Sequence, residues 1–290
     1  MNVSVDFALL LINKPKDITS TEVLNKLKKK FNLKKLGHTG TLDPFAEGLL
    51  IILLGRATRL AEYYQRLPKT YIATGILGIS TDTYDITGKI IKQIEGEYPT
   101  EKELKKVLKT FIGEIEQIPP PFSAKKIKGK RAYHLARKGK QVELKPIKVK
   151  IYDLQLLDYQ PPRFTIEVTV SGGTYIRSLI KDIGDRFLIG ATTESLIRTA
   201  IGNLNLEKAH KLDKVLSSLS LEEFLLPPWE GLPYPTVEVD RVKALKLKNG
   251  QPIEVEVPIA GDRFLVFSQG DFVGLAKPFK GRLKPEKIFL

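Results

Sequence analysis

The chain has 290 residues, of which 42% are hydrophobic and 28% are charged, a composition typical of a globular protein with one sizeable core and a small second domain. It contains no cysteine, which excludes disulfides, thiolate zinc sites and cysteine nucleophiles. Its three histidines, His38, His134 and His210, are far apart and lie in no metal-binding pattern, so we expect no metal. The N-terminal apolar run has no basic leader, and no run approaches the roughly 18 apolar residues of a membrane span, so we expect a cytoplasmic protein.

The net charge of +14 is concentrated in two segments. Residues 123–150 hold eleven Lys or Arg against one acid, and residues 26–35 hold six with no acid. A localised positive field is expected of a surface that neutralises phosphates, so we predict a nucleic-acid partner. The predicted RNA contacts are Lys125, Lys126, Lys128, Lys130 and Arg131. A solvated basic face is the alternative, and a membrane surface is disfavoured because the basic segment has no strong apolar face.

The predicted elements begin with a strand in the N-terminal apolar run. A helix should follow, because Thr19 and Glu22 form a capping-box pattern and Val23, Leu27 and Phe31 recur every four residues. Further along, the patterns predict strands at 49–54, 70–77, 147–158 and 163–171, and helices from near Thr58, from the capping box of Thr100 and Glu103, and over 175–187. These elements predict a mixed α+β domain that starts with a strand.

A proline-rich stretch, residues 227–233, is typical of a linker and predicts a domain boundary. We therefore expect a first domain over 1–231, with a basic insert near 119–150, and a second domain over 232–290. The tail holds about five short strand-like runs, including 236–239, 253–257, 264–268 and 272–276, which predict a small all-β module.

The loop from Gly37 to Pro44 presents one histidine and one aspartate between glycines. Its glycines permit backbone conformations closed to other residues, and Pro44 favours an extended conformation at Asp43. The carboxylate of Asp43 should therefore be held on a defined turn beside a buried strand, and functional side chains concentrate on such loops. A tight turn in which Asp43 only accepts hydrogen bonds from backbone amides is the alternative.

Several separated motifs follow one another between Leu11 and about Gly202. They are INKP at 12–15, GHTGTLDPFAEGLL at 37–50, KTY at 69–71, TDTYDITG at 81–88, IPPPFSA at 118–124, YHLARKG at 133–139 and GTYIRSL at 173–179. Together these motifs resemble the bacterial tRNA pseudouridine synthases of the TruB type, and the tail resembles a short RNA-binding PUA module. The resemblance implies the pseudouridine synthase catalytic fold, with a mixed, mainly antiparallel central sheet and flanking helices.

The resemblance implies an isomerase that converts uridine to pseudouridine in the T loop of tRNA, at position 55, with base flipping. It implies no cofactor, and it implies the tRNA T stem-loop as partner with no obligatory protein partner. A carboxylate suits the chemistry because positive character develops on the sugar when the glycosidic bond breaks. Asp43 is the predicted nucleophile, and Arg177 is implied as the guanidinium that keeps it ionised and oriented.

Other site residues are also implied by matching motif positions. Tyr71 matches the residue that stacks on the detached base and removes its C5 proton. His38 matches the residue associated with the flipped nucleotide, and Arg59 matches a basic position near the site. The remaining matches are Tyr175 and Leu196 as pocket walls and Lys14 and Pro15 as support for the aspartate loop, whereas Phe122 departs from the usual tyrosine.

Two other functions remain open on the sequence. The basic segments alone would serve a noncatalytic RNA-binding or tRNA-folding factor, although Asp43, Tyr71 and Arg177 together favour an enzyme. A guide-RNA-dependent pseudouridine synthase shares the catalytic motifs, although the long basic insert favours stand-alone recognition. An unrelated aspartate-dependent hydrolase is a more distant alternative.

Overall fold

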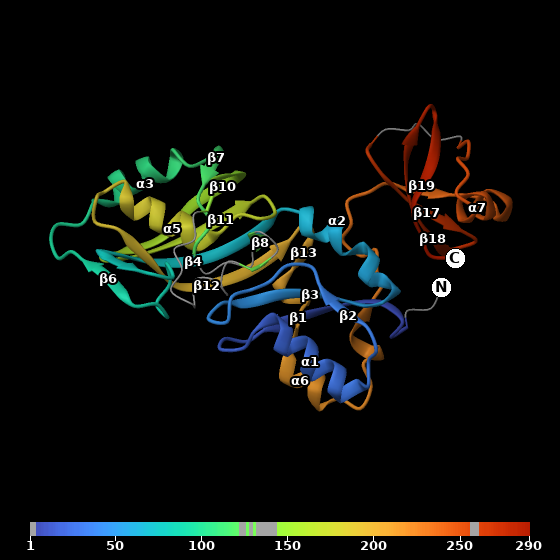
Figure 1. Cartoon of the computed structure of the whole chain (residues 1–290), viewed down its shortest axis with the longest axis horizontal. Helices are drawn as coiled ribbons and strands as arrows, with labels where there is room; N and C mark the ends of the chain where they lie inside the picture. Colours follow the sequence, from blue (N-terminus) through green and yellow to red (C-terminus); the bar gives the residue numbers. More distant parts are fainter. Residues whose placement is uncertain (1–3, 122–125, 128–129, 132–143, 256–260) are drawn as a thin grey trace.

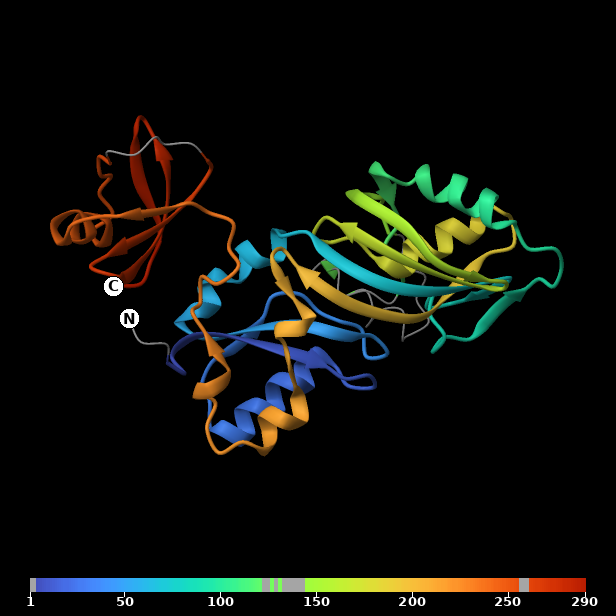
Figure 2. The ribbon, with the colours of Figure 1, turned by 180° about the vertical axis from the view of Figure 1, so that it is seen from behind.

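The computed structural model describes residues 4–121, 126–127, 130–131, 144–255 and 261–290. A long curved sheet with helices on both faces forms most of the molecule, and a small second sheet lies beside one end of it (Figures 1 and 2). The second sheet contains the C-terminal residues.

The long sheet has eleven strands, and most neighbouring strands run antiparallel. Its main path is β14 (His210–Lys211), β1 (Phe7–Lys14), β3 (Glu47–Gly55), β12 (Ala191–Ile201), β4 (Lys69–Leu77), β11 (Arg163–Val170), β10 (Ile147–Gln160) and β7 (Gly113–Gln117). Three short strands, β2 (Leu36–His38), β13 (Leu204–Asn205) and β15 (Leu225–Leu226), pair with β3, β12 and β1. The predicted α+β fold with a mixed, mainly antiparallel sheet is confirmed.

Strands β1 and β3 are apolar on both faces because both faces are covered. One face packs against α1 (Ser20–Phe31) and α6 (Leu212–Ser217), and the other packs against the short helices η1 (Arg56–Leu60) and α2 (Ala61–Arg66). The predicted capping box begins α1, since the Thr19 hydroxyl accepts from the Glu22 amide at 3.0 Å while the Glu22 carboxylate accepts from the Thr19 amide at 2.7 Å.

The other half of the sheet alternates buried and less buried residues, as β4 does along its whole length. Its covered face packs against α3 (Glu101–Lys109) and α5 (Ile176–Asp185), and the capping box of Thr100 and Glu103 begins α3 as predicted. The remaining short elements are β5 (Ile79–Thr81), β6 (Ile90–Gln93), β8 (Lys126–Ile127), β9 (Lys130–Arg131), η2 (Leu206–Lys208) and η3 (Glu222–Phe224).

The C-terminal module comprises β16 (Thr236–Glu238), β17 (Phe264–Ser268), β18 (Asp271–Phe279), β19 (Arg282–Ile288) and α7 (Arg241–Lys248). The small β-sheet is confirmed, whereas α7 was not expected from the sequence. The helical pattern of α7 was obscure because basic residues are interspersed with its apolar ones and only Ala244 and Leu247 are buried, although Asp240 caps its first turn. Of the run 253–257, Ile253 forms an isolated bridge to Leu283, and residues 256–260 lie outside the described residues.

The module contacts the rest of the chain mainly through aromatic rings. The rings of Trp229 and Phe272 lie 4.5 Å apart between centroids, and those of Phe7 and Phe289 lie 4.8 Å apart. Two arginines beside these rings donate to backbone carbonyls of the last strand region, Arg56 to Phe289 and Arg59 to Ile288, each at 2.7 Å. The contact is therefore an apolar stack with a few polar bonds at its margin.

Candidate active site

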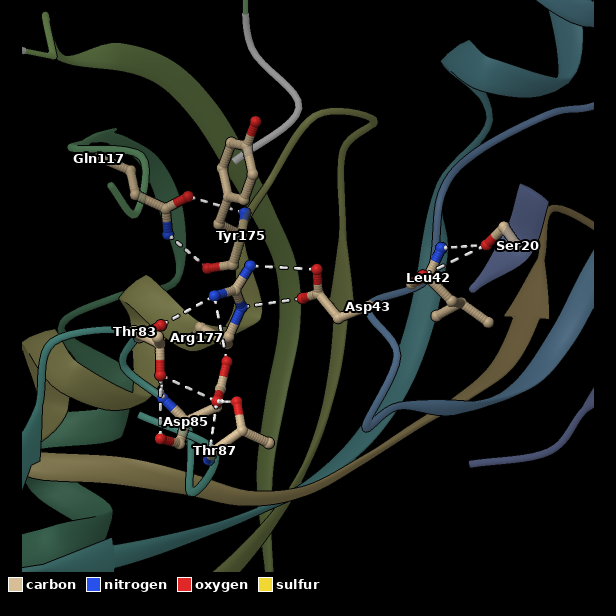
Figure 3. Close-up of polar contacts among 9 residues, drawn as sticks. All are labelled: Ser20, Leu42, Asp43, Thr83, Asp85, Thr87, Gln117, Tyr175 and Arg177. Atoms are coloured by element: carbon tan, nitrogen blue, oxygen red, sulfur yellow. Dashed lines mark hydrogen bonds and ion pairs between the residues drawn. The ribbon is translucent and has the colours of Figure 1, made fainter. Parts of the chain in front are cut away.

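The loop that carries Asp43 is anchored to the start of α1. The Leu42 amide donates to the Ser20 hydroxyl at 2.9 Å, and that hydroxyl is also within 3.2 Å of the Leu42 carbonyl (Figure 3). The Leu42 side chain is buried in the core formed with α5 and β4. Because its neighbour is fixed at both backbone and side chain, Asp43 has a defined place and direction.

Lys14, at the end of β1, supports the same loop through hydrogen bonds to backbone carbonyls. Its buried ammonium donates to the carbonyls of Ile18 at 2.7 Å, Pro15 at 2.8 Å and Pro44 at 3.3 Å. Burial lowers the pKa of Lys14 to about 8, and the Asp43 carboxylate acts against this shift. This geometry agrees with the predicted supporting place of Lys14 and Pro15 beside the loop.

Asp43 forms a two-point ion pair with Arg177 of α5. Arg177 Nε lies 2.8 Å from Asp43 Oδ2, and Nη2 lies 3.1 Å from Oδ1 (Figure 3). The Arg177 side chain is only 5% exposed, whereas the Asp43 side chain is 34% exposed and faces the cavity described below. Burial raises the pKa of the Asp43 carboxyl above its ordinary value, while the Arg177 guanidinium acts in the opposite direction and favours the carboxylate.

Asp85 holds Arg177 from its other side. Arg177 Nη1 lies 3.1 Å from Asp85 Oδ2 and donates to the Thr83 carbonyl at 2.8 Å. The second oxygen of Asp85 accepts from the Thr87 amide at 3.0 Å and from the Thr83 hydroxyl at 2.9 Å, which fixes the loop after β5. Arg177 lies in the first turn of α5, where the helix dipole disfavours a cation, so the two carboxylates offset that disadvantage.

Tyr175, directly before α5, is fixed through its backbone by Gln117 at the end of β7. The Tyr175 amide donates to Gln117 Oε1 at 2.8 Å, and Gln117 Nε2 donates to the Tyr175 carbonyl at 3.0 Å (Figure 3). Ser178 adds a bond from its hydroxyl to the Ile118 carbonyl at 2.8 Å. The start of α5, and with it Arg177, is therefore held by the segment that leads into the basic insert.

Asp43, Tyr175 and Arg177 lie in the wall of a cavity of about 330 Å³. It is lined by Thr39, Gly40, Thr41, Leu42, Asp43, Gln65, Lys69, Tyr71, Gly173, Thr174, Tyr175, Ile176, Arg177, Leu196 and Arg198. Five of the residues predicted from the sequence meet there: Asp43, Tyr71, Tyr175, Arg177 and Leu196. Tyr71 and Leu196 come from the neighbouring strands β4 and β12, so the sheet supplies the floor and the aspartate loop and α5 supply the walls.

Other predicted residues do not line this cavity. His38 ends β2 directly before the first lining residue, and Arg59 lies on η1 with its guanidinium over the Phe289 ring of the C-terminal module. Lys126, Lys130 and Arg131 belong to the short strands β8 and β9. Lys125, Lys128 and Phe122 lie outside the described residues.

Three lining or supporting residues were not predicted as site residues. Asp85 belongs to the TDTYDITG motif, Lys69 is two residues before Tyr71, and Arg198 is two residues after Leu196. Residues two apart on a strand share a face, so this spacing was the signal that could have identified the two cations. Arg198 also ties the loop to β3, because its Nε donates to the Leu49 carbonyl at 2.7 Å and its Nη2 to the Gly40 carbonyl at 3.1 Å.

Within the described ranges, no group of three or more His, Asp or Glu side chains is arranged to hold a metal ion. The same residues include no helix that is long and apolar enough to cross a membrane. The expectations of no metal and no cofactor remain predictions.

Comparison with known proteins gives matches along the whole chain. Residues 28–176 match the family described as TruB family pseudouridylate synthase, N-terminal domain, and residues 235–289 match pseudouridine synthase II TruB, C-terminal. The tRNA pseudouridine synthase B of Aquifex aeolicus is 44% identical over 97% of this chain and 99% of its own length. That of Caldanaerobacter subterraneus subsp. tengcongensis is 37% identical over 99% of this chain and 100% of its own.

Solved structures agree in fold. A chain of a Cbf5-Nop10-Gar1 complex superposes with a TM-score of 0.76 at 25% identity, covering 99% of this chain and 86% of that one. A chain of an H/ACA RNP bound to a substrate RNA containing 2′-deoxyuridine gives a TM-score of 0.75 at 24% identity, covering 99% and 86%. With the family matched over more than half of the chain and full-length relatives well above 30% identity, the chain belongs to the TruB family of pseudouridylate synthases.

Proposed function

We propose that this chain isomerises uridine to pseudouridine in the T loop of tRNA, with Asp43 as the nucleophile. The observation that carries the proposal is the Asp43 carboxylate, which is open to the cavity and oriented by two bonds from the buried Arg177 guanidinium. Relatives that align over nearly the whole chain are named tRNA pseudouridine synthase B. The T-loop site follows from that family assignment.

The reaction needs a group that deals with positive character on the sugar carbon. Breaking the bond between uracil N1 and the sugar leaves such character at C1′, and a carboxylate stabilises or attacks it, as in glycoside hydrolysis. The base then turns and forms a bond from its C5 to C1′. The C5 hydrogen leaves as a proton while N1 gains one, so the product is an isomer and no redox partner or imported group is required.

Tyr71 is the residue proposed to stack on the detached base and take the C5 proton. Its ring is buried in the cavity floor beside Leu196, while Tyr175 forms another wall. A uridine in a folded T arm reaches such a cavity only after it is flipped out of its stack. His38, directly before the first residue that lines the cavity, is proposed to contact the RNA when the uridine is flipped out.

Affinity for tRNA is assigned to the basic insert near 119–150 and to the second domain, residues 232–290. The match of residues 235–289 to the TruB C-terminal family supports this division of the chain. Arg59 lies where η1 meets that module, and we assign it to RNA binding rather than to the chemistry. Because tRNA is the substrate, we expect the protein to act in the cytoplasm without an obligatory protein partner.

A guide-dependent synthase is the second candidate, since the solved neighbours come from multiprotein complexes. Those neighbours are 24–25% identical to this chain, whereas the tRNA pseudouridine synthases B quoted above are 37–44% identical. The difference favours the stand-alone tRNA enzyme.

The test is to incubate the purified chain alone with an unmodified tRNA T-arm hairpin and to map pseudouridine at single-nucleotide resolution. We expect conversion at the T-loop uridine and none at the other uridines. A second hairpin with cytidine at the target position controls for off-site modification. A requirement for an added guide RNA and protein partners would replace the proposal with the guide-dependent one, and binding without conversion would leave the RNA-folding factor.

A further inference from the structure

Two buried cations, Lys69 and Arg198, line the cavity in addition to Arg177. Lys69 begins β4 and is 6% exposed, and Arg198 lies near the end of β12 and is 1% exposed. Both side chains lie beside Gly40, where a Cβ would be 3.5 Å from Arg198 Nη1 and 3.8 Å from Lys69 Cε. A lysine and an arginine at such close quarters repel each other.

Neither cation has a carboxylate partner within the described part of the chain. Lys69 Nζ donates to the carbonyls of Gln65 at 2.8 Å and Leu67 at 2.7 Å, which uses two of its three donors. Arg198 donates through Nε and Nη2, and no bond from its Nη1 is found among these residues. Each of the two side chains therefore keeps donor capacity that the described residues do not use, and Arg198 Nη1 lies beside Gly40.

The charge of the cavity is also unbalanced. Its lining contains three cations, Lys69, Arg177 and Arg198, against one carboxylate, Asp43, which gives a net formal charge of +2. Asp43 is already paired with Arg177, so it does not neutralise the other two. Burial, and to a lesser extent Arg198, lowers the pKa of Lys69 to about 8, so this environment disfavours the charged ammonium. Buried charges that lack a counter-charge are unfavourable, and a bound anion would supply one.

The sheet places these cations next to the predicted base platform. Lys69 and Tyr71 lie two residues apart on β4, Leu196 and Arg198 lie two apart on β12, and Tyr71 is the cross-strand partner of Arg198. All four therefore share one face of the sheet. A uracil on Tyr71 and Leu196, with its ribose at Asp43, would extend its sugar-phosphate chain toward the cations.

We infer that Lys69 and Arg198 form a subsite for a phosphate group that flanks the target uridine. The inference rests on the proposed function. One phosphate would supply the missing counter-charge and accept from both side chains, since charge-assisted bonds of this kind are strong and orienting. The subsite would hold the nucleotide by its backbone while the base is detached and turns.

A purely structural role is the competing account. In it, Lys69 only caps the carbonyls of Gln65 and Leu67, and Arg198 only ties the aspartate loop to β3. The two accounts differ in one respect that can be measured: a structural pair does not respond to the charge of the RNA backbone beside the uridine.

The experiment uses T-arm hairpins in which one phosphate, either 5′ or 3′ of the target uridine, is replaced by a neutral methylphosphonate. The nucleotide on the 5′ side of that linkage carries a 2′-O-methyl group to prevent strand cleavage. Each hairpin is compared, by equilibrium binding, with one that has the same 2′-O-methyl group and an ordinary phosphate. At one of the two positions we expect the neutral linkage to weaken binding to the unaltered protein by roughly tenfold or more.

Variants then assign that loss to the subsite. Lys69→Met should weaken binding to the ordinary hairpin and should discriminate much less between the neutral and ordinary hairpins, because the two changes remove the same contact. Lys214→Met, an exposed lysine on α6, should retain the full discrimination. Circular dichroism checks that both variants are folded.

Two outcomes overturn the inference: neutral linkages at both positions that leave the affinity of the unaltered protein unchanged, or full discrimination retained by folded Lys69→Met. The first outcome needs no variant, so the inference is tested even if Lys69→Met does not fold. Failure of the proposed function is separate, since it shows as no pseudouridine on the fully unmodified hairpin. A chain that forms pseudouridine yet is indifferent to both neutral linkages loses only the phosphate subsite.

Discussion

The cavity around Asp43 and the contact of the C-terminal module are built by opposite means. Around the cavity, several of the buried side chains are charged, and these are tied at specific atoms, as Arg177 is to Asp43 and Asp85. At the module contact, the buried groups are mainly rings, with Trp229, Phe7 and Phe289 stacked around Phe272. The first region depends on the direction of bonds, and the second depends on apolar area.

The two regions therefore serve different purposes: the ion pairs fix the positions of the cavity side chains, and the aromatic stack holds the C-terminal module to the rest of the chain. Buried ion pairs are a weak source of net stability, because desolvation offsets much of their attraction, but they allow few alternative arrangements. Aromatic stacks stabilise without demanding one arrangement of polar atoms. We therefore expect changes at the ion-paired residues Asp43, Arg177 and Asp85 to act mainly on the reaction step, and changes at the stack to act on RNA affinity.

The largest effect is expected for Asp43→Asn. The change keeps the shape of the side chain and removes the carboxylate, so isomerisation should fall below detection while tRNA binding changes by only a few-fold. Single-turnover assays and equilibrium binding on a T-arm hairpin measure the two quantities. Asp213→Asn, on the exposed face of α6, is the matched control. Substantial turnover by the Asp43 variant would remove it from the role of nucleophile.

Tyr71→Phe tests the proposed base. The ring and its stacking remain while the hydroxyl is lost, so the protein should fold and bind tRNA but isomerise about 100- to 10,000-fold more slowly, the usual scale of general-base losses. A single-turnover assay measures the rate, and Tyr152→Phe on β10, with an exposed ring, is the control. A rate within a few-fold of the unaltered protein would leave Tyr71 only a stacking role.

Asp85→Asn tests the position of Arg177. Asn keeps an oxygen near Arg177 Nη1 but removes one of the two charges that hold the guanidinium. We expect the single-turnover rate to fall about tenfold to a hundredfold, and we expect a lower midpoint of thermal unfolding because a buried ion pair is broken. Binding of the hairpin should change less than the rate. A destabilised variant with an unchanged rate would show that Asp85 serves the fold alone.

Trp229→Ala tests the other region. Loss of the indole should loosen the C-terminal module and weaken tRNA affinity by about tenfold, while the rate on saturating RNA stays within a few-fold. Limited proteolysis near residues 227–233 should also become faster. Phe279→Ala removes a ring of the same module that is 42% exposed, and it should have little effect on either quantity. Equal losses of rate and affinity would contradict the separation of the two regions.

The smallest effect concerns pH and Lys14. Its pKa in the folded protein, about 8, lies below the ordinary value of 10.5, so between these values the unfolded chain binds more protons. The free energy of unfolding of the unaltered protein, relative to that of Lys14→Met, should therefore rise from pH 8 to pH 10, by at most about 1.4 kcal/mol per pH unit. Urea unfolding at several pH values measures this. A difference that is flat or falls with pH would contradict the lowered pKa of Lys14.

Much of the order of the elements could be predicted from the sequence because it depends on local patterns. The capping boxes at Thr19 and Thr100 mark helix starts by themselves, and the alternation on β4 reports a half-buried strand. Asp43, Tyr71 and Arg177 lie in separate motifs, and it was the resemblance of those motifs to a family that grouped them. The positions of these three residues in the sequence do not give the distances between their side chains in the fold.

The parts that escaped prediction depend on contacts between distant segments. Asp85 is one polar residue among several in its motif until α5 brings Arg177 against it. Lys69 and Arg198 are isolated charges in two strands, and only the pairing of β4 with β12 brings them together. Arg59 was expected near the cavity, whereas the fold of η1 directs it toward the C-terminal strand, and no local pattern carries that direction.

Two hydrogen bonds join the Gln117 side chain to the backbone of Tyr175, so a chimera whose exchanged segment begins after residue 117 would retain this link to α5. They use only the side-chain amide of one partner and the main chain of the other, so they do not depend on the side chains of the basic insert. Chimeras that exchange residues 122–143 between relatives would cross on the far side of this link. Such exchanges would change which RNAs bind while leaving the geometry of Asp43 and Arg177 unchanged.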